Sequence, residues 1–197
     1  MSKHVSATDP QVYSVVLAAG LSRRFGSTKQ LAKVDGESLV ARAAAIADAA
    51  CPGRSLLVVG HDAGRVIAAG RGQCRGIVVN DRFQEGIGSS IACTAHAVQH
   101  AATGLLITLV DQPLVGLEHL NALLAAFATN PDKVVTSRYA STIGPPAVVP
   151  RALFPALGNL VGDRGAKSVL QTAERVEIAF EEAAVDIDRP GDLEALA

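Results

Sequence analysis

The sequence predicts a single α/β domain built on a doubly wound, mostly parallel β-sheet. Short apolar runs rich in β-branched residues, typical of strands buried on both faces, alternate along the chain with runs of helical spacing. A chain of 197 residues is long enough for one domain with a full hydrophobic core. No segment has the composition of a linker or a repeat. We therefore expect residues 12–197 to form one domain.

The alternation of strands and helices can be followed to about residue 137. The predicted strands are Val12–Ala18, Ser55–Gly60, Gly76–Asn80, Leu105–Val110 and Lys133–Ser137. The predicted helices are Leu39–Ala50 with Ser38 as N-cap, a short helix from a cap at Asp62 to about Gly70, Ser89–Ala102 and Leu117–Thr129. This order favours parallel pairing, with helices on both faces of the sheet.

The pattern changes after Ser137. Glycine and proline punctuate the next segment, and because proline lacks a backbone donor we expect no regular structure there. These residues are Gly144, Pro145, Pro146 and Pro150. A polar glycine turn, GDRGAK, a strand-like RVEIAF and a terminal VDIDRPGDLEAL follow. We interpret this region as an elaboration of the same domain.

The composition limits the classes of partner. The net charge is −1, aromatic residues make up 4% and tryptophan is absent, so we expect no nucleic-acid partner. No apolar segment has the length of a membrane span or the pattern of a signal peptide, so we expect a cytoplasmic protein with no membrane partner. The three cysteines contain no C-x-x-C pair, which argues against a disulfide framework or a zinc site. Residues 1–11 are polar and predict a flexible arm.

The loop after the first predicted strand concentrates positive charge. The segment LAAGLSRRFGSTKQL, Leu17–Leu31, contains Arg23, Arg24 and Lys29. Like charges this close together repel one another unless an anion lies among them. Gly20 permits close backbone approach or a positive φ, successive N–H groups can form an anion-binding nest, and Arg and Lys bind phosphate oxygens. We therefore predict a phosphate-binding loop, although neither G-x-x-x-x-G-K-[ST] nor G-x-G-x-x-G occurs there.

Acidic residues follow two other extended segments. The run LLITLVDQP places Asp111 after a strand, where it either faces the phosphate loop as a Mg²⁺ ligand or caps a turn. The run VDIDRPGDL places Asp186 and Asp188 on one face of an extended segment. One of these two could complete a metal site opposite Asp111, while Asp188 could instead cap the last helix.

Two glycine-containing loops are further candidates for binding. In NDRFQEGIGSSI, Gly86 and Gly88 form a flexible turn, and Ser89 and Ser90 begin a helix whose free N–H groups and hydroxyls suit an anion. Ordinary helix capping explains one of these serines equally well. The turn GDRGAK either contacts a second substrate or caps the helix that follows it.

Taken together, these motifs resemble those of a known family. LAAGLSRRFGSTKQL is similar to the L-A-A-G-x-S-x-R-x-G-x-x-K-x-L signature of nucleotidyltransferases. With NDRFQEGIGSSI, VDQP, GDRGAKSVL and DIDRPGDL, the chain resembles the molybdenum cofactor cytidylyltransferases of the MobA-like group, from about Val12 to Leu196. The resemblance implies a Rossmann-like sheet of the nucleotide-diphospho-sugar transferase type. It also implies transfer of CMP from CTP to the molybdopterin cofactor, with release of pyrophosphate.

The resemblance also implies roles for individual residues. The implied nucleotide-binding residues are Leu17, Ala18, Ala19, Gly20, Arg24, Lys29, Asn80, Ser89 and Ser90. Lys29, Arg24 and Asp111 are implied to be catalytic, and Asp111 and Asp188 to bind Mg²⁺. Ala19 suggests CTP rather than GTP, because members of the family that use GTP tend to have glycine there. The segment IGPPAVVP stands where relatives often carry a Gly-x-Pro acceptor loop.

Two alternatives remain open at this point. The acceptor could be another phosphorylated compound, such as a sugar phosphate or a small metabolite. The chain could also be a carrier that delivers molybdenum cofactor to a molybdoenzyme without catalysis. Arg24, Lys29 and Asp111 favour an enzyme, because a carrier has no evident need for a metal-binding carboxylate opposite a phosphate loop.

Overall fold

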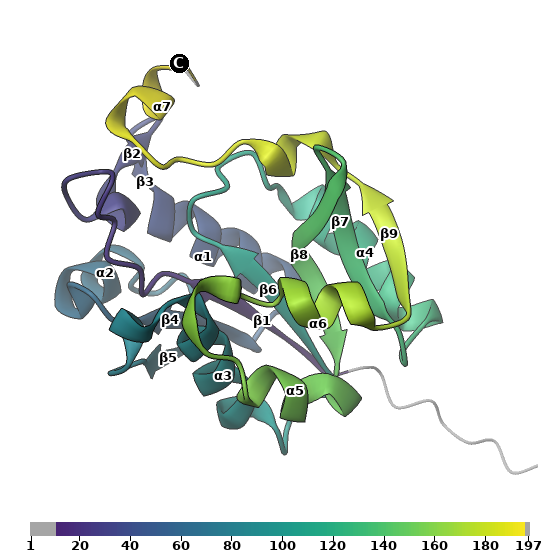
Figure 1. The fold of residues 1–197 in the computed structure, drawn as a ribbon. Coiled ribbons are helices and arrows are strands. Elements are labelled where there is room, and N and C mark those ends of the chain that lie inside the picture. The colour runs from purple at the N-terminus through teal and green to yellow at the C-terminus, as the bar shows by residue number, and fades with distance from the viewer. Residues whose placement is uncertain (1–10, 196–197) are drawn as a thin grey trace, which may run out of the picture.

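The computed structural model describes residues 11–195, so residues 1–10 of the predicted arm lie outside the described residues. Its centre is a seven-stranded sheet in the order β5-β4-β1-β6-β8-β7-β9 (Figure 1). The strands are β1 (Val12–Leu17), β4 (Ser55–Val59), β5 (Gly76–Val79), β6 (Gly104–Leu109), β7 (Val134–Tyr139), β8 (Thr142–Pro150) and β9 (Arg175–Ala179). A separate ribbon pairs β2 (Lys33–Val34) with β3 (Glu37–Ser38).

The directions of the strands confirm the predicted mostly parallel sheet. Strands β5, β4, β1 and β6 pair in parallel, and β9 is parallel to β7. Only β8 runs antiparallel to its neighbours β6 and β7. The chain is thus a single-domain α/β fold.

Strand β8 corrects the expectation that prolines interrupt regular structure after Ser137. The register of β7 against β8 shifts between Thr136 and Ser137, so Thr136 pairs with Ala147 and Ser137 with Gly144. Pro145 and Pro146 therefore lie inside a bulge, where no ladder donor is required of them. The prediction was wrong because a bulge tolerates proline inside a strand that is paired on both sides.

The helices cover both faces of the sheet, as predicted. The helices are α1 (Leu39–Ala50), α2 (Ala63–Ala69), α3 (Ile87–Val98), α4 (Leu117–Thr129), α5 (Phe154–Gly158), α6 (Lys167–Thr172) and α7 (Pro190–Glu194). One face packs against α3, α5 and α6, and the other packs against α1, α2 and α4 (Figure 1). No helix within residues 11–195 is long and apolar enough to cross a membrane.

Two predicted helix starts have different outcomes. The Ser38 side chain accepts a hydrogen bond from the Ala41 N–H at 3.3 Å and caps α1 as predicted. Asp62 precedes α2, but its carboxylate caps no backbone donor. It accepts hydrogen bonds from Thr28 and Arg65 instead, at 2.6 and 3.0 Å, so this carboxylate ties the first loop to α2.

Helix α3 also differs from its predicted bounds: it starts at Ile87 and ends at Val98 rather than spanning Ser89–Ala102. Its start is earlier because Gly86, with φ 100°, turns the chain directly into the helix.

The C-terminal segment leads from β9 to α7 and crosses the end of β6 (Figure 1). It contains the 3₁₀ turn Glu181–Ala184. The backbone N–H of Ile187 donates to the Asp111 carbonyl at 2.9 Å. This contact holds the last part of the chain beside the carboxyl ends of β1 and β6, the edge at which parallel α/β sheets bind ligands.

Candidate active site

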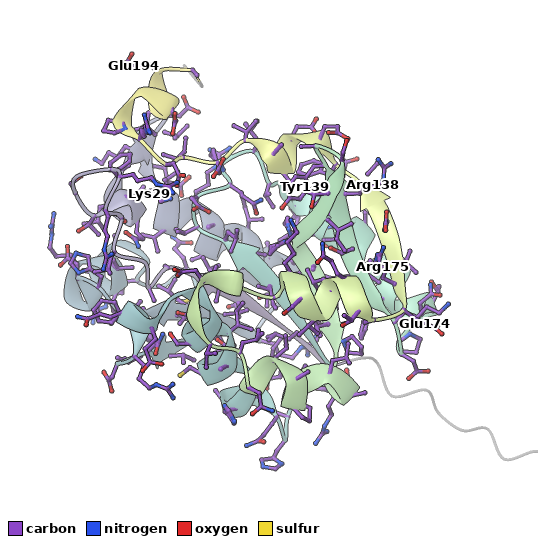
Figure 2. The ribbon with its side chains drawn as sticks, viewed as in Figure 1. Lys29, Arg138, Tyr139, Glu174, Arg175 and Glu194 are labelled. Atoms are coloured by element: carbon purple, nitrogen blue, oxygen red, sulfur yellow. The ribbon has the colours of Figure 1, made fainter. Side chains whose placement is uncertain are left out.

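A cavity of about 410 Å³ opens at the carboxyl ends of β1 and β6. The loop after β1, the start of α3, the end of β6 and the C-terminal segment contribute to its wall. Predicted site residues on the wall are Leu17, Ala19, Gly20, Arg24, Lys29, Ser90, Asp111 and Asp188. Figure 2 places Lys29 beneath α7, across this edge from Arg138 and Tyr139 of β7. The structure thus brings together the phosphate loop and the acidic residues that were predicted from separate motifs.

Lys29 lies between two carboxylates of the cavity wall, those of Asp111 and Asp188. Its Nζ is 2.8 Å from Asp111 Oδ2 and 3.2 Å from Asp188 Oδ1. The second oxygen of Asp188 accepts from Arg24 Nη1 at 2.9 Å. Lys29 comes from the 3₁₀ turn Lys29–Leu31, Asp111 follows β6 and Asp188 precedes α7. Two cations and two carboxylates from three distant parts of the sequence therefore form one cluster.

Charge pairing outweighs burial in this cluster. Burial alone would lower the pKa of Lys29, but the charges and hydrogen bonds of Asp111 and Asp188 raise it above its ordinary value. Burial alone would raise the pKa of Asp188, but Lys29 and Arg24 lower it overall. Both groups therefore stay ionised across the neutral range.

The acidic residues of the cluster do not cap helices. Backbone N–H groups of Asp188 and Arg189 donate to the Asp192 side chain at 2.8 and 2.7 Å. Asp192 therefore does the capping at α7, which leaves the Asp188 carboxylate to Lys29 and Arg24. Asp186 is exposed to solvent. The loss of water on its covered side, together with the negative charges of Asp188 and Asp111, raises the pKa of its carboxyl. Of the two aspartates considered for a second ligand, Asp188 is the one paired with Lys29.

The residues present suit a divalent cation. Asp111 Oδ1 is buried and has no hydrogen-bond partner among residues 11–195, and such an oxygen is costly to bury unless something binds it. Mg²⁺ is typically held by one or two carboxylates together with substrate phosphates and water. Asp111 and Asp188 supply the two carboxylates.

A buried glutamine that the sequence analysis did not single out holds the loop after β1. Gln30 is 1% exposed. Its amide Nε2 donates to the carbonyls of Ala18 and Gly20 at 3.1 and 2.9 Å, and its Oε1 accepts from Ser22 at 3.1 Å. The Ser22 hydroxyl in turn accepts from the Lys29 N–H at 3.2 Å. This network fixes the loop at its start and at Lys29.

The positive φ angles of this loop are not at Gly20. They occur at Ser22, with φ 52°, and at Gly26, with φ 78°. Of the two uses predicted for Gly20, only close backbone approach remains, and this residue is exposed on the cavity wall.

Asn80, Ser89 and Ser90 form a second hydrogen-bonded group. Asn80 Nδ2 donates to Ser89 Oγ at 2.8 Å and to Ser90 Oγ at 2.9 Å. All three residues are buried, and only Ser90 lines the cavity. Ala18 is also buried and is not on the wall. Asn80 therefore holds the end of β5 to the start of α3, and its predicted contact with a nucleoside stays a prediction.

The start of α3 packs against the turn that contains GDRGAK. A Cβ at Gly86 would lie 2.5 Å from the Gly162 carbonyl carbon, and one at Gly88 would lie 2.9 Å from the Gly162 carbonyl oxygen. Both positions therefore need glycine. This backbone contact brings Asp163 to the cavity wall.

Side chains also hold the Gly-Pro-Pro segment of β8. The carbonyls of Gly144, Pro145 and Pro146 accept hydrogen bonds at 3.0, 3.2 and 2.6 Å. The donors are Thr136, Gln112 and Ser137, respectively. Gln112 directly follows Asp111, and its Nε2 also donates to the Ala183 carbonyl at 2.7 Å. Sequence reasoning missed Gln112, although the quoted run VDQP contains it.

Comparison with known proteins adds to this geometry. A model of the MobA-like NTP transferase domain matches residues 14–177, which is most of the chain. The chain belongs to the MobA-like NTP transferase family. It is a nucleotidyltransferase, and the matched family confirms the resemblance of the motifs to the MobA-like group. The matched range contains the loop after β1, the start of α3 and Asp111, whereas Asp188 lies beyond it.

The chain is similar to known proteins over nearly its whole length. The sequence is 30% identical over 192 residues to nicotine blue oxidoreductase of Paenarthrobacter nicotinovorans, and the alignment covers 91% of this chain and 93% of that protein. A solved homologue of Rv0371c from Mycobacterium sp. strain JC1 is 28% identical, with a TM-score of 0.82 and 94% coverage of both chains. Rv0371c of Mycobacterium tuberculosis, solved in complex with manganese, is 26% identical, with a TM-score of 0.77 and coverage of 94% and 97%. A relative of the same fold therefore accepts a divalent cation.

Proposed function

We propose that this nucleotidyltransferase is Mg²⁺-dependent and transfers CMP from CTP to the molybdopterin cofactor, releasing pyrophosphate. The observation that carries the proposal is the cluster of Lys29, Arg24, Asp111 and Asp188 beside the loop after β1. Cations that can bind a phosphate chain and carboxylates that can bind a metal share one cavity there. The product would pass to a molybdoenzyme, and we expect the reaction to take place in the cytoplasm.

The proposed reaction is an in-line displacement at the α-phosphorus of CTP. An oxygen of the acceptor's terminal phosphate forms the new bond to this phosphorus, while the bond from the α-phosphorus to the bridging oxygen of the β-phosphate breaks. Pyrophosphate leaves with that electron pair. The attacking oxygen is already anionic, so no strong general base is required. Catalysis then consists of positioning and charge neutralisation.

The residues of the cavity supply both contributions. Lys29 and Arg24 neutralise negative charge that develops on the leaving pyrophosphate. The loop after β1, held by Gln30, presents its backbone to the phosphate chain. Asp111 and Asp188 would hold Mg²⁺, which would polarise the phosphoryl oxygens.

The choice of nucleotide rests on Ala19, which is 4% exposed and lines the cavity. Relatives that use GTP tend to have glycine at this position, so the methyl group favours CTP. The choice of acceptor rests on the resemblance of the motifs to cytidylyltransferases. A sugar phosphate or another phosphorylated metabolite is the alternative acceptor within the same reaction class.

The deciding experiment measures pyrophosphate release with Mg²⁺ and each of CTP, GTP, ATP and UTP, with and without molybdenum cofactor. Release with CTP that depends on the cofactor is the expected result. Release with GTP instead would keep the chemistry and contradict the role of Ala19. If only a different phosphorylated compound from an acceptor panel supports release, the acceptor is wrong. Tight binding of cofactor without any release would favour the carrier function.

Similarity to nicotine blue oxidoreductase adds a redox reaction as a second candidate. The same assay can distinguish a redox reaction from nucleotidyl transfer if it also contains a reduced nicotinamide nucleotide and a redox dye. Oxidation of the nicotinamide with no pyrophosphate release would favour the second candidate. The paired cations and carboxylates favour phosphoryl chemistry, because a hydride transfer has no need of such a cluster.

A further inference from the structure

The Lys29 ammonium lies where the two carboxylates of the proposed metal site meet. It contacts Asp111 Oδ2 at 2.8 Å and Asp188 Oδ1 at 3.2 Å. A Mg²⁺ ion bridging the same two oxygens would lie about 2.0–2.1 Å from each of them. It would then be in contact with the ammonium. The lysine and a divalent cation therefore cannot share this place.

The remaining oxygen of Asp111 does not avoid the conflict. Oδ1 is buried and unpartnered within residues 11–195. A cation at Oδ1 would still lie on the carboxylate that binds Lys29, with two positive groups close together in a partly buried place. Lys29 is 11% exposed, so water screens this repulsion weakly.

The charges of the cluster cancel as it stands. Lys29 and Arg24 balance Asp111 and Asp188. A divalent cation alone would leave this group with excess positive charge, and a phosphate chain alone would leave it with excess negative charge. Both together compensate one another. Lys29 and Arg24 also line the cavity beside the loop after β1, so a phosphate chain there offers them new partners.

We propose that Lys29 excludes divalent cations from Asp111 and Asp188 until the phosphate chain of a nucleotide draws its ammonium away. Lys29 then exchanges carboxylates for phosphate, and the carboxylates become available to the cation. Nucleotide and cation raise each other's affinity by the same factor, as linkage requires. This inference rests on the proposed function, because it assumes that both ligands meet in this cavity.

The first test measures Mn²⁺ binding to the nucleotide-free protein, by electron paramagnetic resonance of the unbound ion. Lys29→Met should bind Mn²⁺ at least about tenfold more tightly than the unmodified protein. Arg23→Met is the matched control, since it removes one positive charge from the same loop and Arg23 takes part in none of the ion pairs of residues 11–195. Its affinity should change by about twofold or less.

Two further variants make the outcome decisive. Asp111→Asn added to Lys29→Met should abolish the gain in affinity, which locates the bound ion. Lys29→Gln replaces Lys29→Met if the latter does not fold. Equal Mn²⁺ affinity of Lys29→Met and the unmodified protein would overturn the proposal. Equal gains in Mn²⁺ affinity in Lys29→Met and Arg23→Met would also overturn the proposal, because the gain would then follow from removing any positive charge of the loop.

The second test follows the ¹⁵Nζ resonance of Lys29, assigned from its absence in Lys29→Met. The signal should stay in place with Mg²⁺ alone and shift when CTP is added with Mg²⁺. A shift with Mg²⁺ alone, or no shift while CTP binds, contradicts the exchange of partners. Neither test requires an acceptor or turnover. If no pyrophosphate is released with CTP and molybdenum cofactor, the proposed function is wrong, but the results of these two tests can still be interpreted.

Discussion

The loop after β1 and the Gly-Pro-Pro segment of β8 each contain backbone carbonyls that are held by a buried glutamine, but the two glutamines reach over different distances along the chain. In the loop, Gln30 binds the carbonyls of Ala18 and Gly20, at most twelve residues away. In β8, Gln112 binds the Pro145 carbonyl, 33 residues away. The first arrangement is local, whereas the second requires several elements to pack first.

The difference suggests what each region can tolerate. The hydrogen bonds of Gln30 lie within one loop, so their loss should disturb mainly that loop. A network that joins distant segments carries global stability, since its polar groups are buried wherever the segments meet. Substitutions in the loop should therefore change ligand binding and turnover, and substitutions around β8 should change the free energy of unfolding.

The largest effect is expected at the charged end of the loop. Lys29→Ala or Asp111→Ala should lower turnover by about 10²-fold or more, because each removes charge stabilisation from the transition state. Pyrophosphate release by the folded variants measures this. Arg65→Ala is a suitable control, since Arg65 pairs with Asp62 rather than with the cluster. Near-normal turnover in both cavity variants would contradict the assigned roles.

The second largest effect is a loss of stability at Gln112, which holds the Gly-Pro-Pro segment of β8. Gln112→Leu leaves the Pro145 and Ala183 carbonyls without their donor and should lower the free energy of unfolding by about 2–4 kcal/mol. Urea denaturation measures the change. Thr136→Val removes a hydroxyl that has one proton to donate and whose shorter contact is with the Gly144 carbonyl, so its loss of stability should be smaller. Equal losses would mean that the number of carbonyls left unpaired does not matter.

A smaller effect is expected at Gln30. Gln30→Met keeps a similar length of side chain and adds no charge, but removes the amide that binds Ala18 and Gly20. We expect KM for CTP to rise about tenfold, by roughly the net strength of one or two hydrogen bonds, and the unfolding free energy to change less than in Gln112→Leu. Steady-state kinetics and urea denaturation on the same sample test this. A stability loss matching that of Gln112→Leu would refute the contrast between the two regions.

The smallest effect concerns acid stability. The pKa of Asp188 in the folded protein lies below its ordinary value of 3.8 because Lys29 and Arg24 outweigh the effect of burial. Its contribution to stability is therefore present above pH 3.8 and is lost as the pH falls through the lower, folded pKa. Asp188→Asn should be less stable than the unmodified protein near neutral pH and equally stable in strong acid. Urea denaturation over a pH series would show whether the two curves converge.

The same contrast explains which features could be predicted from the sequence. The strands of the main sheet and the longer helices up to about residue 137 follow from short-range patterns, as does the cationic loop with Lys29, whereas the short ribbon of β2 and β3 was not predicted. Strand β8 could not be predicted from the sequence. Its prolines are tolerated only because the pairing register with β7 shifts between Thr136 and Ser137, which leaves Pro145 and Pro146 in a bulge. Asp188 pairs with Lys29 instead of capping the last helix, because Asp192 caps α7. Gln30 and Gln112 were missed because an amide shows its importance only through the carbonyls it meets in the fold.

The close contact between the start of α3 and the Gly162 turn has a consequence for protein engineering. In a chimera that joins the first part of this chain to the last part of a relative, Gly86 and Gly88 would face a turn that comes from the other protein. Any side chain at Gly86 or Gly88 would collide with that turn. Crossover points should therefore be chosen so that these glycines are inherited together with the facing turn, and libraries of recombinants can be filtered on that requirement before they are made.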